Sequence, residues 1–98
     1  MVKYLESNKI SRKLRESLLR GMAEKAIKED DEIEIAIKVN RLDKDVLDKI
    51  SKHANILDIV KLTKHIHAKT KVKKLRDLID DDDIALLDEV TEMRALEG

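Results

Sequence analysis

Several residue types are missing from this sequence, which has no cysteine, proline, tryptophan or phenylalanine and only one tyrosine. Without cysteine, the chain can form no disulfide, no thiol nucleophile and no zinc site built on thiolates. With almost no aromatic side chains, the core must be aliphatic, and a basic surface would offer nucleic-acid bases little on which to stack. These absences exclude thiol chemistry and argue against binding by stacking on nucleic-acid bases.

Charge of both signs is abundant but balanced. Lysine and arginine number 21, as do aspartate and glutamate, so the formal net charge is zero although 43% of the residues are charged. A neutral chain has no bulk attraction to nucleic acid or to an anionic membrane, and we expect neither as a partner. Abundant lysine and glutamate without cysteine resembles the composition of thermophile proteins.

The length and hydropathy of the chain suit one small domain. Its 98 residues are enough for one modest core. No apolar stretch is long enough to span a bilayer, and the first residues show no apolar h-region. We therefore expect neither a transmembrane helix nor a signal peptide in the chain as given.

Two segments alternate between aliphatic and polar residues with the period of two that is typical of a half-buried strand. They cover Ile33–Val39 and His65–Lys71, and we expect them to be the central strands of a sheet. The apolar run Ile84–Leu87 predicts a further strand. The run Ile56–Leu62 carries aliphatic residues on both faces, and it predicts either a strand before a hairpin or one long bulged strand continuous with the next.

Apolar residues at helical spacing predict three helices. Ser11 is the expected N-cap of the first, which should run to about Glu29 with Gly21 as a weak point inside it. Asp43 should cap the second, and the third should cover Val72–Ile79.

The order of these elements is that of an α+β ferredoxin-like plait, βαββαβ, with an extra N-terminal helix and an extended C-terminal tail. We expect residues 1–30 to form a helical extension, residues 31–90 the ferredoxin-like domain and residues 91–98 the tail. Both crossover helices would cover one sheet face. The opposite face would stay open, and its predicted residues are Glu34, Ala36, Lys38, His65, His67 and Lys69.

Three stretches, DEIEIAIKVN, HIHAKTKVKKLRDLIDDDDIALLDE and VTEMRAL, give the segment Glu32–Leu96 a family likeness. It resembles the propeptide of subtilisin-like serine proteases, a family that includes free-standing propeptide-like inhibitors. The upstream NKISRKLRESLL is similar to the leader of archaeal members. The family often has proline where this chain has Lys71 and Asp82, and Glu97 and Gly98 extend past the position where processing would fall.

The resemblance implies a function as intramolecular chaperone and inhibitor of a subtilisin-like serine protease. The tail Met93-Arg94-Ala95-Leu96 would occupy the active-site cleft by β-augmentation, with Leu96 in the primary pocket and Met93 in a second one. A terminus that only frays is the alternative for these residues.

The same resemblance assigns Asp88 and Glu89 as acids that cap the N-termini of two protease helices on which the open face would rest. Their alternative is a solvated strand end. An excised propeptide would be extracellular and a free-standing inhibitor cytoplasmic. The competing function is a non-enzymatic regulatory or scaffold module that forms a homodimer through its open face.

Other side-chain groups point less clearly to a site. His65 and His67 share one strand face and could be two metal ligands, but surface or partner contacts are the better interpretation because a metal site needs about three or four ligands. Asp80–Asp83 lacks the spacing of a calcium loop and predicts a turn. We expect no cofactor, metal or catalytic set. One further basic cluster consists of Lys69, Lys71, Lys73 and Lys74.

Overall fold

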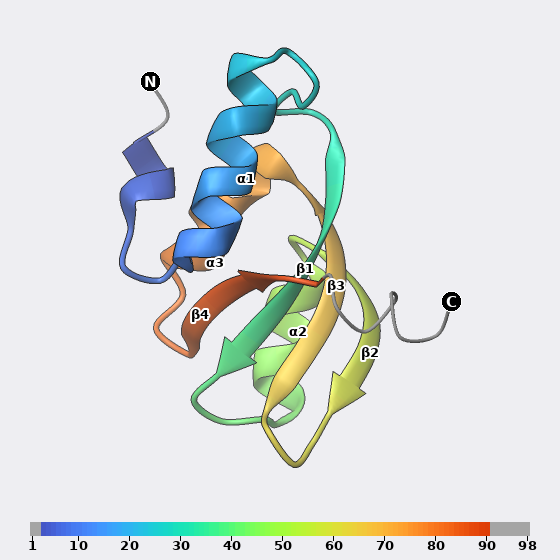
Figure 1. Cartoon of the computed structure of the whole chain (residues 1–98). Helices are drawn as coiled ribbons and strands as arrows, with labels where there is room; N and C mark the ends of the chain where they lie inside the picture. Colours follow the sequence, from blue (N-terminus) through green and yellow to red (C-terminus); the bar gives the residue numbers. More distant parts are fainter. Residues whose placement is uncertain (1–2, 91–98) are drawn as a thin grey trace, which may run out of the picture.

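The computed structural model describes residues 3–90, a small α+β domain with a four-stranded antiparallel sheet and three α-helices (Figure 1). Two short 3-10 helices, η1 and η2, complete the fold. In chain order the elements are η1 Lys3–Glu6, α1 Arg12–Ala23, β1 Glu32–Val39, α2 Lys44–Ser51, β2 Asn55–Val60, β3 His65–Lys71, η2 Val72–Lys74, α3 Leu75–Ile79 and β4 Ile84–Glu89.

The sheet has the strand order β2-β3-β1-β4, and every neighbouring pair is antiparallel. The strands β1 and β3, which alternate best in the sequence, are its two central strands, as predicted. Ile35 lies opposite Ala68, and Ile37 lies between Ile66 on β3 and Leu87 on β4. These five side chains are fully buried, so one face of the sheet forms the floor of the core.

All three helices pack on that same face. Figure 1 shows α2 behind the central strands and α1 at the top of the view. The helices contribute one continuous set of buried side chains to the core, namely Leu14, Leu18, Val46, Ile50, Leu75 and Leu78. The sequence patterns predict a core of nine residues, and eight of these are buried, namely Val46, Ile50, Leu75 and Leu78 on the helices and Ile35, Ile37, Ile66 and Ala68 on the sheet. The ninth, Ile33, is only half-buried against the core.

The segment before α1 also contributes residues to the core. Its apolar residues show no helical or strand period, so the sequence did not predict this. Leu5 and Ile10 are 0% and 2% exposed. Arg15 holds this segment against α1, because its guanidinium donates to the carbonyl oxygens of Leu5, Ser7 and Ile10 at 2.7–3.2 Å. Three acceptors on one guanidinium fix an irregular backbone that has few hydrogen bonds of its own.

The first helix begins after its N-cap Ser11, as predicted, but ends at Ala23, well before Glu29. The helix does not break at Gly21. Instead, the chain turns back over Gly21, whose carbonyl accepts from Ala26 N at 2.8 Å and Ile27 N at 3.1 Å. A Cβ on Gly21 would lie 2.7 Å from Ile27 Cγ1, so only glycine leaves room for this return.

The apolar run after α2 ends at Val60 and forms a separate strand joined to β3 by a hairpin. The turn has no glycine, and Lys64 takes the left-handed conformation with φ 57. A register shift between Ile56 and Asp58 places Leu57 in a bulge. This bulge explains why both faces of the run carry aliphatic residues, since one extra residue reverses the alternation.

Candidate functional site

The face of the sheet opposite the helices is formed by residues of all four strands. Its centre consists of three cross-strand pairs between β1 and β3, which are Glu34–Lys69, Ala36–His67 and Lys38–His65. Those six residues alternate with the buried ones, so the register brings together the open-face residues predicted from the sequence. Most of them are half-buried by their neighbours, and Lys38 is exposed.

The edge strands extend each row of this open face. On β2, Asp58 lies beside His67 and Val60 beside His65. On β4, Asp88 lies beside Ala36, and Leu86 lies beside Lys38. The resulting surface mixes both signs of charge with three apolar positions, Ala36, Val60 and Leu86.

The two histidines do not belong to a metal cluster. Within residues 3–90, no group of three or more histidine and carboxylate side chains is placed to hold a metal ion. His65 and His67 share a strand face, and Asp58 beside His67 is the one potential further ligand among their cross-strand neighbours, but these side chains are not placed as a group that could hold a metal ion. A role for the two histidines in contacting a partner stays a prediction.

The acids at the end of β4 face opposite sides of the sheet. Asp88 pairs with Ala36 on the open-face side, whereas Glu89 pairs with Ile35 on the core side. Each accepts a hydrogen bond from a serine at or within the first helix, α1. Ser11 Oγ lies 2.6 Å from Asp88 Oδ1, and Ser17 Oγ lies 3.0 Å from Glu89 Oε2.

Asp88 therefore sits at the N-terminus of a helix in its own chain. Ser11 caps α1 by accepting from Leu14 N at 3.1 Å, and its hydroxyl then donates to Asp88. A carboxylate at this position is favoured by the positive end of the helix dipole. Sequence patterns identified the cap but not its acidic partner, because the two residues lie 77 positions apart and no local signal links them.

The N-terminal segment also pairs with the outer edge of β4. Leu87 N donates to Lys9 O at 2.6 Å, and Ser11 N donates to Leu87 O at 2.9 Å. Lys9 Nζ reaches the carbonyl oxygens of Ile79 and Asp81. The last strand is thus fixed from both sides, by β1 and by residues 9–11.

The aspartates Asp80–Asp83 form a turn, as predicted, and cations of the chain itself hold it. Lys49 Nζ lies 3.2 Å from Asp81 Oδ1 and 2.6 Å from Asp83 Oδ2, and Arg41 Nε lies 3.2 Å from Asp83 Oδ1. The hydrogen bond from Lys49 lowers the pKa of Asp83, and the same bond raises the pKa of Lys49. These pairs link α2 to the turn before β4.

The expected cleft-binding residues Met93, Arg94, Ala95 and Leu96 lie outside the described residues. The description ends at Val90, directly after β4. Because β4 is an edge strand of the sheet, the last described residues lie at a sheet edge.

The part of the chain that the structure describes contains no helix long and apolar enough to cross a bilayer. Comparison with known proteins finds no match to the chain among family models, curated proteins or solved structures.

Proposed function

We propose that this protein is a propeptide-like chaperone and inhibitor of a subtilisin-like serine protease. The observation that carries the proposal is the open sheet face, which no helix within residues 3–90 covers and to which all four strands contribute residues. A half-buried, charge-mixed sheet face of this kind suits docking on another protein better than binding a small molecule, which prefers a concave site.

The proposal includes the ferredoxin-like plait. The strand order β2-β3-β1-β4 with two strand-helix-strand crossovers is the order expected for βαββαβ, and it supports this assignment. In the proposed complex, the open face would rest on paired surface helices of the protease. The fold alone hosts many functions, so the proposal depends on the face and on the tail.

Of the two acids at the end of β4, Asp88 is the one suited to reach a partner helix. It lies on the open-face side, and its Oδ1 accepts from Ser11 Oγ and Glu89 N. Among the described residues no hydrogen bond reaches Oδ2, and a carboxylate has further acceptor sites to offer. Glu89 is bonded to Ser17 on the core side, so we propose a structural role for it.

Residues 91–98 follow β4 and would form the inhibitory segment. In an extended conformation they can add main-chain hydrogen bonds at the edge of the protease cleft, with pockets for Met93 and Leu96. The docked domain would keep this segment close to the cleft, so its binding becomes effectively intramolecular. The whole chain should therefore inhibit far better than the isolated tail peptide.

The test is inhibition of a broad-specificity subtilisin by three proteins: the full chain, a chain ending at Glu89, and Leu96→Asp. Leu96→Asp should weaken inhibition by about tenfold or more, because it loses pocket burial worth about 1.5–3 kcal/mol and desolvates a carboxylate. Leu62→Asp is the matched control, since Leu62 is 98% exposed on the hairpin turn, far along the chain from the tail. Its inhibition should equal that of the unchanged chain.

Equal potency of the full chain, the truncated chain and Leu96→Asp would remove the tail from the mechanism. No inhibition of any subtilisin-like protease tried, including one from a thermophile, would remove the proposal. The chaperone role has its own readout, which is the yield of active protease recovered from denaturant with and without the domain.

A second function, dimerisation through the open face, is favoured by the charges on that face. Lys38 and Lys69 lie on the same surface as Glu34, Asp58 and Asp88, so two copies related by a two-fold axis could pair opposite charges. Analytical ultracentrifugation separates the two functions. A dimer that Ala36→Arg converts to a monomer, combined with no protease inhibition, would favour the scaffold module.

A further inference from the structure

The two edge strands of the sheet differ in what lies beside them. Residues 9–11 bond to the outer edge of β4 through Leu87, whereas within residues 3–90 the only strand that pairs with β2 is β3. Figure 1 shows β2 as the outermost strand on its side of the sheet. The unpaired N–H and C=O groups of such an edge can bind a further strand.

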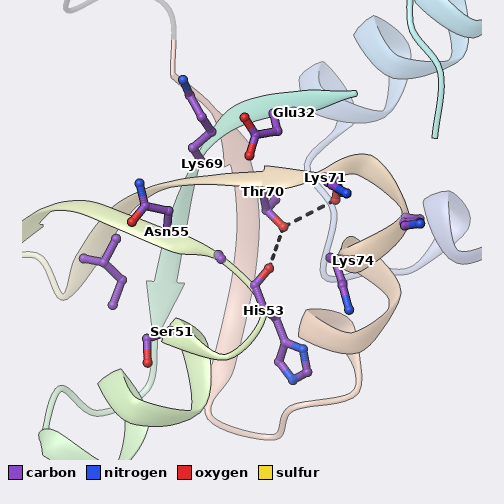
Figure 2. Close-up of a pocket in the computed structure, with 11 residues that line it drawn as sticks. Glu32, Ser51, His53, Asn55, Lys69, Thr70, Lys71 and Lys74 are labelled. Carbon is purple, nitrogen blue, oxygen red and sulfur yellow. Dashed lines mark hydrogen bonds between the residues drawn. The ribbon is translucent and has the colours of Figure 1, made fainter. Parts of the chain in front are cut away.

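The side of β2 that faces β3 is held firmly, so the outer edge has a fixed shape. Figure 2 shows the beginning of β2, where Asn55 pairs with Lys69 of β3. Just before it, Thr70 Oγ1 donates to the carbonyl oxygen of His53 at 2.9 Å. The pairing with β3 continues to Val60, the last residue of β2. A partner would therefore bind an edge that is already ordered, which lowers the entropic cost of association.

One N–H group of this edge points away from the sheet. In the pair of β1 and β3, Val39 N donates to Lys64 O. Alternate residues of β3 bond to β1 and to β2, so Ile66, two positions further along, also bonds to β1. Ile59, which lies opposite Ile66 on β2, therefore turns its own N–H outward. This N–H donates to the side chain of the neighbouring Asp58, whose Oδ1 lies 2.9 Å from the nitrogen.

This contact protects the edge only lightly. It is exposed and local, so the carbonyl of an added strand can replace it. Asp58 is also the only charged residue of β2, and Leu57 in the bulge is 49% exposed. Edge strands that stay unpaired are usually protected by more charge than this.

A groove of about 620 Å³ lies beside the same edge, between α2 and the hairpin that follows β2. Its apolar lining is half-buried and consists of Leu42, Leu47 and Ile59. Charged side chains surround this lining, namely Asp43, Lys44, Asp48, Lys61 and Lys64. An apolar centre with a polar rim is the usual composition of a protein–protein interface, and Ile59 joins this centre to the strand edge.

We propose that the outer edge of β2 binds the same edge of a second copy of this chain, with the two strands antiparallel and a two-fold axis at Ile59. The N–H and C=O of Ile59 in each copy would bond to Ile59 of the other copy, and the two apolar grooves would meet beside the axis. The four strands of each copy would then form one sheet with all helices on one side.

The charges beside the axis explain why a second copy fits this edge. Asp58 and Lys61 lie on opposite sides of Ile59 in the sequence, so an antiparallel copy places Lys61 of each chain beside Asp58 of the other. Within residues 3–90, neither side chain forms an ion pair, and both are exposed. Asp58, released from the N–H of Ile59, would be free to accept from that lysine. This dimer requires neither docking on the open face nor residues 91–98, so its test needs no protease.

The experiment is sedimentation equilibrium of the full chain over a range of concentrations, with amide hydrogen exchange measured on the same samples. We expect a dimer that forms as the concentration rises and that weakens as sodium chloride is raised. The amide of Ile59 should exchange more slowly in the dimer. Asp58→Lys and Lys61→Asp each place like charges together at two symmetric positions, so each should weaken dimerisation by about tenfold. The double variant Asp58→Lys/Lys61→Asp should restore the dimer, because it exchanges the two charges.

Two variants serve as controls. Glu16→Lys reverses an exposed charge on α1 and should leave dimerisation unchanged. Ala36→Arg changes the open face and should also leave it unchanged, which separates this dimer from one formed through that face. A chain that stays monomeric up to about 1 mM, or an Ile59 amide whose exchange does not depend on concentration, would overturn the proposal. So would a double variant that fails to regain the dimer, or a dimer that Ala36→Arg abolishes and Asp58→Lys does not.

Discussion

The bond between Ser11 and Asp88 allows the structural role of Asp88 to be separated from the role proposed in a complex. Replacing Asp88 by alanine removes the acceptor that lies 2.6 Å from Ser11 Oγ. It also removes a negative charge from the N-terminus of α1. A hydrogen bond to a charged group contributes about 1.5–3 kcal/mol and a charge at a helix end about 0.3–1 kcal/mol. Because Asp88 is half-exposed, we expect Asp88→Ala to cost only about 1–2 kcal/mol.

Two further variants divide this cost. Asp88→Asn keeps an acceptor of the same size, so it should lose only the charge contribution of about 0.3–1 kcal/mol. Ser11→Ala loses the cap to Leu14 as well, at about 0.5–2 kcal/mol. In the double variant Ser11→Ala/Asp88→Ala, the shared bond is lost once and not twice. The coupling energy should therefore be about 0.5–1.5 kcal/mol.

The assay is urea denaturation of the unchanged chain and these four variants, with the midpoint compared at constant slope. Glu16→Ala is the control, since Glu16 is exposed on α1 and should change stability by less than about 0.5 kcal/mol. A coupling energy within about 0.3–0.5 kcal/mol of zero would refute the bond in solution. Asp88 would then be free to act on a partner, and any effect of Asp88→Ala on inhibition could be assigned to the interface.

Three other outcomes are expected. Ile35→Ala should cost about 2–5 kcal/mol because Ile35 is fully buried, while the half-buried Ile33→Ala should cost clearly less; equal losses in a denaturant titration would contradict the assigned face. Gly21→Ala should destabilise the chain, because overpacking against Ile27 costs about 1–3 kcal/mol and exceeds the gain in helix propensity. In an Ile27→Ala background the same change should stabilise the chain. A change of the same sign in both backgrounds would contradict the contact between position 21 and Ile27. Because the folded state lowers the pKa of Asp83, the ion pairs of Asp83 stabilise the fold above about pH 4 and lose this effect as pH falls through the folded pKa. The difference in unfolding free energy between the unchanged chain and Lys49→Met should therefore shrink in acid and in high salt. A difference that persists at low pH would show that the charge of Asp83 is not its source.

Residues that obey a local rule were predictable from the sequence. The alternation in β1 and β3 fixed which residues are buried, because one face of a strand repeats every second residue. Ser11 and Asp43 were identifiable as caps, because serine and aspartate accept from backbone N–H groups at helix starts, as both do here. The six residues of the open face followed from the same alternation.

The features that sequence patterns missed depend on tertiary contacts. Leu5 and Ile10 lie in an irregular segment, so no period marked them as core residues. Gly21 was interpreted as a weak point of a helix, whereas its lack of a side chain makes room for Ile27. Lys64 adopts a left-handed conformation that glycine or asparagine would normally signal.

The N-terminal segment, whose function the sequence left open, is the element that most constrains any function of the β4 end. Residues 9–11 occupy part of the outer edge of β4, and Ser11 and Ser17 bond the two acids that follow Leu87. A partner that approached β4 from this edge would have to displace those bonds. A partner on the open face would meet only the Ser11–Asp88 bond, because the helices pack on the opposite side of the sheet. Residues 9–11 therefore oppose the addition of a strand beside this part of β4, whereas the helices of the described residues leave the open face uncovered.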